Sequence, residues 1–243
     1  MKKYIFILIA FTITSCNDDI SSNDAALDVG QGGSLATFTI LNDYLYTVDN
    51  QNLNVFNIST TNNAVLVNTV FIGFDIETLI SYKNVLYIGS RNGMFIYDTV
   101  NPEAPKQLSA VQHFTACDPV IANDTHAFVT LNTSLGCGTD ISALQIYDIK
   151  DLTNPILISQ RNLLAPKGMG LYGKYLFVCD DEVKIFDISD PENSKLVHSI
   201  NTAAFDVIII NDKVITVGNN TLNQFALNKN DITNTSLLST ISI

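Results

Sequence analysis

The sequence has few positive charges for its length. Its 243 residues include 13 Lys and Arg against 24 Asp and Glu, which gives a formal net charge of −11. Proteins bind nucleic acids mainly by neutralising phosphates, so the sequence excludes a nucleic-acid-binding protein. Anionic membrane surfaces are excluded as direct partners by the same repulsion. An acidic surface favours solubility, and it favours cations or basic partners.

Residue types that build common metal and catalytic sites are also scarce. The chain has three histidines and four cysteines, with no CxxC pair and no Cys–His cluster, so no zinc site is expected. The motifs HExxH and GxSxG are absent from the sequence. Residues 30–33, GQGG, are followed by no helical pattern and form no phosphate-binding loop. We therefore expect no cofactor and no enzymatic activity.

Long apolar runs are missing, except for one short run at the N-terminus. Residues 4–13 are almost wholly apolar and follow Met1-Lys2-Lys3. Ten residues rise about 15 Å as a helix, which is about half the thickness of a hydrocarbon core. This segment is typical of a signal-peptide core and is too short for a membrane span.

The leader ends in Ile13-Thr14-Ser15-Cys16, which resembles the lipobox of bacterial lipoproteins. The resemblance implies a signal peptide over 1–16, with Cys16 lipidated and anchoring the chain to a membrane. Residues 17–34 are polar at their start and lack periodicity, so they predict a disordered tether. Asp18 and Asp19 resemble an export signal. We expect an outer-membrane lipoprotein at the cell surface or on the periplasmic face; the alternative is a plain secretory signal with an incidental cysteine.

The chain beyond residue 34 repeats itself with a period of about 40 residues. Each unit holds four strand-like runs joined by turn residues, and no helical period appears. One aromatic-aliphatic run recurs at 44–49, 85–90, 126–131, 175–180 and 213–218, and a second at 54–59, 94–99, 144–149, 183–188 and 222–227.

These repeats predict an all-β fold, a single β-propeller of five four-stranded antiparallel blades over 35–243. A β-sandwich is the alternative. The first unit begins at its innermost strand and the last ends at its outermost, so no strand is exchanged to latch the ring. We expect either closure by packing alone or an incomplete ring. The predicted blades span about 35–70, 74–111, 117–160, 167–200 and 205–243.

The composition distinguishes between families of β-propellers. The sequence has no Trp, so the Trp-Asp dipeptide of WD40 blades is absent, and so is the paired glycine of kelch blades. The stretches YIGSRNGMFIYD at 87–98 and YLFVCDDEVKIFDISDP at 175–191 resemble the LVIVD-repeat family of bacterial secreted or lipid-anchored chains. That resemblance implies a β-propeller without an established activity. Family members often carry His in the segment that matches 166–170; Lys167 stands there, so no role of that His is carried over.

Polar residues stand where the five inner strands begin, and propellers usually bind ligands on that face. Four carboxylates and one lysine are expected around one mouth of the channel. One interpretation is a Ca²⁺ site or a pocket for a basic or polyhydroxyl ligand. The other, which we favour, is that the Asp side chains accept hydrogen bonds from nearby backbone N–H groups. The ligand-face candidates are Asp75, Glu77, Asp118, Lys167 and Asp206.

Three cysteines remain after Cys16. Cys117 begins an inner strand and Cys137 lies in the longest insertion, 131–143, which is expected on the same rim. A Cys117–Cys137 disulfide would contribute about 3 kcal/mol by closing the loop between them. Two separate buried thiols are the alternative. Cys179 lies in an alternating strand and is expected to be a small core residue.

Together these features predict a lipid-anchored cell-envelope β-propeller that acts as a non-enzymatic binding or assembly module through its acidic loop face. Its partner would be a protein or glycan of the envelope. The alternative is an enzyme that acts on envelope glycans, which requires at least two converging rim carboxylates. A third hypothesis is a subunit whose partner covers the bare first and last blades.

Overall fold

The computed structural model describes residues 33–60, 62–112, 119–132 and 141–243. These residues form twenty β-strands and a single short 3-10 helix, η1 (Pro191–Asn193). The strands make five four-stranded antiparallel sheets, so the predicted five-blade β-propeller is confirmed. In the described part of the chain, no helix has the length and apolar character needed to cross a membrane.

Each blade is one sheet whose strands follow the order of the chain. Blade 1 comprises β1 (Phe38–Leu41), β2 (Tyr44–Val48), β3 (Asn52–Asn57) and β4 (Val65–Phe71). Blade 2 comprises β5 (Ile76–Tyr82), β6 (Val85–Ser90), β7 (Gly93–Asp98) and β8 (Lys106–Gln112). Blade 3 comprises β9 (Val120–Ala122), β10 (His126–Leu131), β11 (Ala143–Asp148) and β12 (Ile156–Asn162). Blade 4 comprises β13 (Met169–Tyr172), β14 (Tyr175–Cys179), β15 (Val183–Asp187) and β16 (Lys195–Ile200). Blade 5 comprises β17 (Asp206–Ile210), β18 (Lys213–Val217), β19 (Thr221–Ala226) and β20 (Ser236–Ser242).

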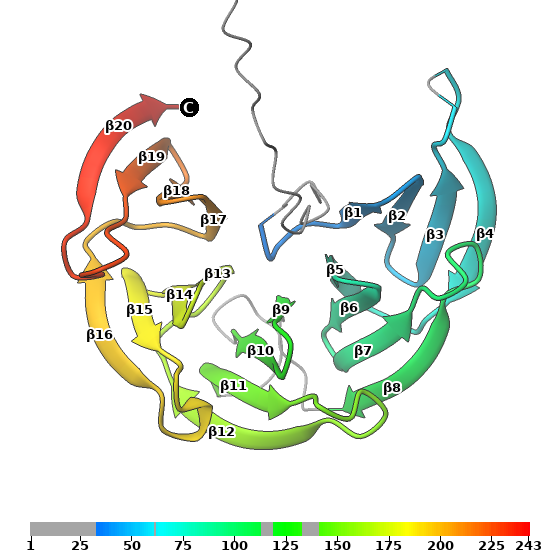
Figure 1. Ribbon diagram of the computed structural model, residues 1–243, viewed down its shortest axis with the longest axis horizontal. Coiled ribbons are helices and arrows are strands. Elements are labelled where there is room, and N and C mark those ends of the chain that lie inside the picture. The colour runs from blue at the N-terminus through cyan, green and yellow to red at the C-terminus, as the bar shows by residue number, and fades with distance from the viewer. Residues whose placement is uncertain (1–32, 61, 113–118, 133–140) are drawn as a thin grey trace, which may run out of the picture.

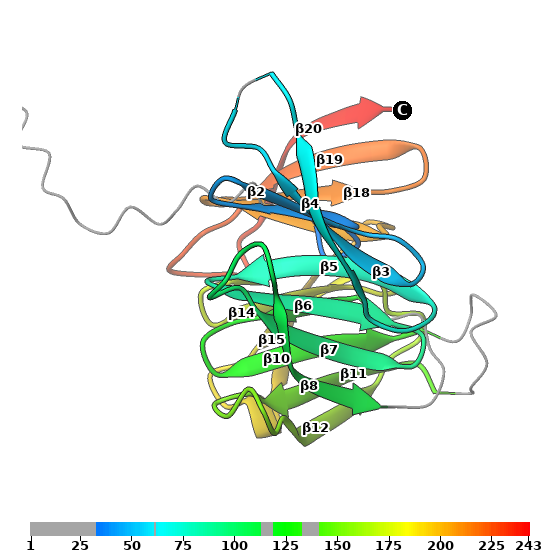
Figure 2. The same cartoon turned by 90° about the vertical axis from the view of Figure 1, so that its right-hand side faces the viewer.

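The first strand of every blade lies nearest the centre and the fourth lies on the outside (Figure 1). Seen edge-on, the turns and connecting loops project on two opposite sides (Figure 2). By topology, the turns between second and third strands and the connections between blades share one side. We call this side the loop face; the turns between first and second strands and the loops between third and fourth strands lie on the opposite face.

The turns between first and second strands use the residues that such turns require. In blades 1, 2, 4 and 5 the turn contains one residue with a left-handed backbone, a conformation that costs Asn and Gly less than other residues, and three of these four residues are Asn or Gly. Positive φ angles of 52° to 57° occur at Asn42, Lys83, Gly173 and Asn211.

The third strands of blades 1 to 4 end in Asn or Asp for a structural reason. The side chain that ends a third strand turns back and accepts a hydrogen bond from the backbone N–H two residues later, which starts the following loop. This contact is made by Asn57, Asp98, Asp148 and Asp187.

The hydrophobic core consists of four clusters, one at each contact between successive blades. One large aromatic residue of the second strand is almost fully buried against the next blade in blades 1 to 4. Fully burying a side chain of this kind contributes about 1.5–3 kcal/mol. These residues are Tyr46, Tyr87, Phe128 and Phe177.

A polar contact also recurs between successive blades. In blades 1 to 4, the residue at one equivalent position of the fourth strand forms a hydrogen bond through its side chain. Its partner lies in the loop between the third and fourth strands of the next blade. The contacts are Asn68 Nδ2 to Glu103 O at 2.8 Å, Ser109 Oγ to Leu152 O at 2.7 Å, Ser159 Oγ to Glu192 O at 3.2 Å, and His198 Nε2 with Thr235 Oγ1 at 3.3 Å.

The ring is open. The blades form an arc, and blade 5 and blade 1 face each other across a gap at the top of Figure 1. None of the four core clusters of the described residues joins these two blades. Of the two arrangements expected from the sequence, the structure therefore has the incomplete ring.

Candidate functional site

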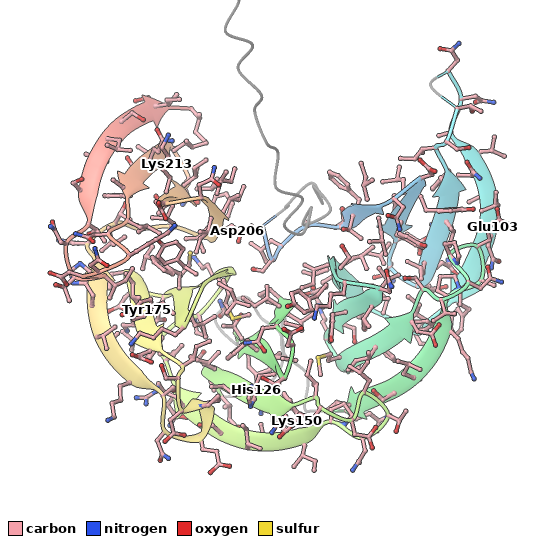
Figure 3. All side chains as sticks on the ribbon, in the orientation of Figure 1. Glu103, His126, Lys150, Tyr175, Asp206 and Lys213 are labelled. Carbon is pink, nitrogen blue, oxygen red and sulfur yellow. The ribbon has the colours of Figure 1, made fainter. Side chains whose placement is uncertain are left out.

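Asp206 is the one buried residue among the described ligand-face candidates. It begins β17, and Figure 3 shows it at the inner end of blade 5, beside the segment that leads into β1. Its carboxylate accepts hydrogen bonds from Val207 N at 2.9 Å and from Ser34 Oγ at 3.4 Å. The backbone N–H groups of Ser34 and Leu35 also donate to it. Asp206 thus satisfies backbone donors, as the favoured interpretation of these carboxylates expects.

The space around this carboxylate is closed by two glycines. A Cβ atom added at Gly33 would lie 1.9 Å from Asp206 Oδ2, and one at Gly168 would lie 2.1 Å from Oδ1. Both distances are far below van der Waals contact, so only glycine fits at either position without a shift. The carboxyl group is therefore packed closely against the backbone at both glycines, and only 8% of the surface of Asp206 is exposed.

Burial changes the acidity of Asp206. Loss of water around the charged form raises its pKa to about 6, although the hydrogen bonds from Val207, Leu35 and Ser34 act in the opposite direction. Burial likewise raises the pKa of the Cys179 thiol. Cys179 is a free, buried cysteine, so its predicted role as a core residue is confirmed.

The segment Gly33–Ala36 connects blades that are distant in sequence, and we call it the N-terminal segment. Met169 N in blade 4 donates to Ser34 Oγ at 2.7 Å, and Leu79 N in blade 2 donates to Ala36 O at 2.7 Å. Only 1% of the surface of Ser34 is exposed. The sequence-based tether ran to residue 34, but Gly33 and Ser34 are instead part of the packed structure, because Asp206 and Met169 bind them.

Glu77 and Asp75 lie at the inner edge of blade 2. Arg91 Nε donates to Glu77 Oε1 at 2.9 Å, so the carboxylate forms an ion pair at the surface. That contact raises the pKa of the Arg91 guanidinium. Asp75 has a left-handed backbone with φ of 56°, and its carbonyl accepts the Arg91 N–H at 3.0 Å.

Lys167 lies in the connection between blades 3 and 4, and its backbone is bound on both sides. Its N–H donates to Cys179 O at 2.7 Å, and its carbonyl accepts from Thr130 Oγ1 at 2.6 Å. Among the described residues, no carboxylate forms an ion pair with its side chain. Lys167 is half-buried, and its backbone position is fixed by blades 3 and 4.

The other candidates fall outside the described residues. They are Asp118 and the lipidation and disulfide candidates Cys16, Cys117 and Cys137. In the part of the chain that is described, no group of three or more His, Cys, Asp or Glu is placed to hold a metal ion.

The turns between second and third strands add acids to the loop face that sequence reasoning missed. Asp49 is exposed in blade 1 and accepts the N–H of Gln51 and of Asn52, each at 2.8 Å, which lowers its pKa. In blade 4, Asp181 and Glu182 occupy the equivalent turn. The signal in the sequence was the position of these acids directly after the repeated second strand.

Asp180 belongs to the same turn but has a structural role. Its side chain is fully buried and accepts Lys184 Nζ at 2.6 Å. It also accepts Leu164 N at 3.0 Å and Ala165 N at 2.6 Å, which fixes the connection from blade 3. The ion pair and these hydrogen bonds offset the free energy that is lost when the carboxylate is removed from water.

The comparisons with known families identify one repeat. Residues 167–202 match the LVIVD repeat. This range begins at Lys167 and contains all four strands of blade 4, so the resemblance predicted from the sequence is confirmed there. No curated protein matches the chain.

Solved structures resemble the chain in fold. A protein from Lactobacillus plantarum superposes with a TM-score of 0.69 at 13% identity, covering 82% of this chain and 67% of that one. The periplasmic gluconolactonase PpgL of Pseudomonas aeruginosa gives 0.64 at 12% identity, with coverages of 83% and 68%. BamB from Moraxella catarrhalis gives 0.54 at 11% identity, with coverages of 79% and 56%. At these identities the likeness concerns the fold alone, and the chain spans about two thirds or less of each of these proteins.

Proposed function

We propose that this LVIVD-repeat propeller is a lipid-anchored, non-enzymatic binding or assembly module of the bacterial cell envelope. Cys16 carries the lipid, and residues 17–32 connect it to the blades. The protein lies at the outer membrane, on the cell surface or the periplasmic face. Its partner is a protein or glycan of the envelope.

The observation that carries this proposal is the use of the rim carboxylates in the structure. Asp206 is enclosed against the N-terminal segment, and Glu77 is paired with Arg91. An enzyme that hydrolyses glycosides needs two carboxyl groups that face a common substrate. These two are instead engaged with protein groups, which favours a rigid framework for binding over a site of bond cleavage.

The contact surface is the remaining acidic part of the loop face. Asp49 is exposed there, and Glu182 and Asp75 are half-buried. Asp181 is also exposed, but its carboxylate forms an ion pair with Lys184 at 2.6 Å. Their turns are fixed by backbone hydrogen bonds, so the charges are held at defined positions on a rigid arc. Such a surface favours a partner with basic or hydrogen-bond-donating groups.

The binding test compares the two faces of the disc. A loop-face variant, Asp49→Asn with Glu182→Gln, removes two charges, and Asn still accepts the hydrogen bonds of the Asp49 turn. Glu192→Gln removes a charge from the opposite face as the matched control. Wild type and variants are applied to arrays of envelope polysaccharides and envelope proteins.

We expect a partner that binds wild type and Glu192→Gln equally and binds the loop-face variant about tenfold more weakly. Mass spectrometry of the bound glycans is expected to show no product. Turnover of any glycan would contradict the proposal, and so would equal binding by all three proteins.

The anchor has its own test. Mass spectrometry of the mature N-terminus is expected to show lipid on Cys16. Protease treatment of intact cells then separates the two faces of the outer membrane, because only a surface protein is removed. A mature chain that begins elsewhere without lipid would contradict the anchor.

A further inference from the structure

One side of the blade 1 sheet has no blade packed against it in the described part of the chain. Phe38 lies opposite Thr47 on this side, and 56% of its surface is exposed. At the equivalent position of the other four blades the exposure is 0% or 1%, because the preceding blade covers it. We call this side the open side of blade 1; it faces the gap in Figure 1. The covered equivalents of Phe38 are Leu79, Val120, Met169 and Val207.

The outer half of the blade 1 sheet is uncharged, although the whole chain is acidic. Residues 50–74 contain no Asp, Glu, Lys or Arg, and this is the longest such run in the sequence. The run includes both β3 and β4. Asp49 precedes it, and the carboxylate of Asp49 is bound by backbone and side-chain amides. A ligand on the open side of blade 1 therefore meets groups that form hydrogen bonds without a net charge of their own.

Polar side chains on this side form one connected network. Thr69 Oγ1 on β4 donates to Asn54 Oδ1 on β3 at 2.9 Å, and Asn54 Nδ2 donates to Asp49 Oδ2 at 3.3 Å. Asn52 Nδ2 donates to Asp49 Oδ1 at 3.1 Å. These contacts fix the orientation of both amides. A primary amide has two N–H donors and an oxygen with two lone pairs, so Asn54 keeps one N–H and one lone pair for a ligand.

Two exposed phenyl rings flank this network. Phe38 on β1 lies in the same row of paired residues as Thr47, Asn54 and Thr69. Phe71 follows two residues after Thr69 on β4, so it is on the same side of the sheet, and it is 59% exposed. The positions equivalent to Phe71 in blades 2 and 3 hold the polar residues Gln112 and Asn162.

This set of groups matches the chemistry of a sugar chain. The C–H groups on one side of a pyranose ring pack on an aromatic ring, and its hydroxyl groups both donate to and accept from amides and hydroxyls. The row from Phe38 to Thr69 crosses three strand spacings, which is about 14 Å and longer than a single sugar ring. The net charge of −11 would repel an acidic glycan, so an uncharged polymer fits better.

We propose that the open side of blade 1 binds a neutral polysaccharide. Sugar rings pack on Phe38 and Phe71, and Asn54 and Thr69 form hydrogen bonds with the hydroxyl groups between them. This inference rests on the proposed function, because it specifies the partner of the binding module as an uncharged glycan.

The test is affinity electrophoresis of the full chain in native gels that contain laminarin, mannan, dextran or hydroxyethyl cellulose. A polyoxyethylene detergent keeps the chain in solution and carries no sugar. Phe38→Ala and Phe71→Ala each remove one exposed ring. Ile156→Ala is the matched control, because Ile156 is also 56% exposed but lies on the outer strand of blade 3. Circular dichroism checks that each variant is folded.

A second pair of variants tests the polar network. Thr69→Val removes the hydroxyl and keeps the shape of the side chain. Thr240→Val is its matched control, since Thr240 occupies the equivalent position in blade 5 and donates to Asn223 Oδ1 at 2.8 Å. A further gel contains carboxymethyl cellulose, which has the same backbone as hydroxyethyl cellulose but carries negative charges.

At least one neutral polysaccharide is expected to slow wild type, Ile156→Ala and Thr240→Val equally. Phe38→Ala and Phe71→Ala are each expected to bind it about tenfold more weakly, and Thr69→Val about fivefold more weakly. Carboxymethyl cellulose is expected to slow none of the proteins.

Three results would overturn the proposal. They are the absence of retardation in all four neutral gels, equal retardation of wild type and the two Phe variants, and stronger retardation by carboxymethyl cellulose than by hydroxyethyl cellulose. An open side that blade 5 or another protein covers would give the first result. A chain that binds an envelope protein but no polysaccharide would overturn this inference alone. Hydrolysis of a bound polysaccharide would contradict the proposed function and leave the binding site standing.

Discussion

Asp206 is the residue at which burial has the clearest chemical consequence. Its pKa is raised from 3.8 to about 6, so between these values the folded chain binds a proton that the unfolded chain releases. The stabilisation from this proton is complete below about pH 4 and is lost as the pH rises through 6. Two pKa units correspond to about 3 kcal/mol at most.

The variant Asp206→Asn isolates this effect, because it has no proton to lose. Relative to the variant, wild type is expected to lose on the order of 2–3 kcal/mol of unfolding free energy between pH 4 and pH 7. Urea unfolding at several pH values measures the difference. A difference that does not change with pH would show that Asp206 titrates normally.

Thr216 places a hydroxyl group in the buried interior of blade 5. Its hydroxyl is fully buried and has no hydrogen-bond partner among the residues that the structure describes. The equivalent residues in blades 2 to 4 are Ile88, Val129 and Val178, which pack on the preceding blade. A buried hydroxyl without a partner destabilises a protein by about 1–3 kcal/mol.

We therefore expect Thr216→Val to raise the unfolding free energy by about 1 kcal/mol. The reverse change at the equivalent position, Val178→Thr, is expected to lower it by a similar amount. Urea unfolding of both variants provides the measurement. A loss of stability in Thr216→Val would mean that the hydroxyl has a partner in solution.

At the scale of elements, the turn between first and second strands is the unit that most directly links sequence to structure. Gly173 has φ of 57°, and a Cβ atom added there would meet nothing within 4 Å. A substitution at this turn therefore tests backbone conformation alone. The equivalent turns of blades 1 and 5 hold Asn42 and Asn211 in the same conformation.

Gly173→Ala is expected to lower the unfolding free energy by about 1 kcal/mol, since Ala tolerates a positive φ poorly. Gly173→Asn is expected to cost less, because Asn occupies two of the equivalent turns. Thermal melting of the pair separates the two effects. Equal losses would indicate that bulk at residue 173, and not backbone conformation, determines the stability.

The same elements show what sequence can predict. Strand order and turn positions follow from local patterns, such as the Asn42-Asp43 and Asn211-Asp212 turns between alternating runs. The state of Asp206 does not, because its partner Ser34 lies 172 residues away and was assigned to a tether. The sequence also predicted Glu77 to be a free acid of the rim. Its partner Arg91 lies in the turn between β6 and β7, and no repeated sequence pattern predicts this ion pair.

At the scale of the molecule, the central feature is an arc of five blades whose ends do not meet (Figure 1). Each blade is stabilised by the blade before it and the blade after it, as in other repeat proteins. In the described part of the chain, blades 1 and 5 are the exceptions, because each packs on only one other blade. At the centre, the N-terminal segment binds Asp206 of blade 5 and Met169 of blade 4. The repeats indicated the absence of a strand latch, but the gap itself depends on how Ser34 and Asp206 pack.

The measurement that tests the open arc most directly is the distance between its ends in solution. Leu66, Leu196 and Leu237 occupy equivalent exposed positions on the outer strands of blades 1, 4 and 5. Spin labels are attached there in pairs through an unnatural amino acid, and the labelled chain is diluted with unlabelled protein. The distance between blades 5 and 1 is predicted to exceed the distance between blades 4 and 5. Equal distances would show a closed ring and would contradict the account.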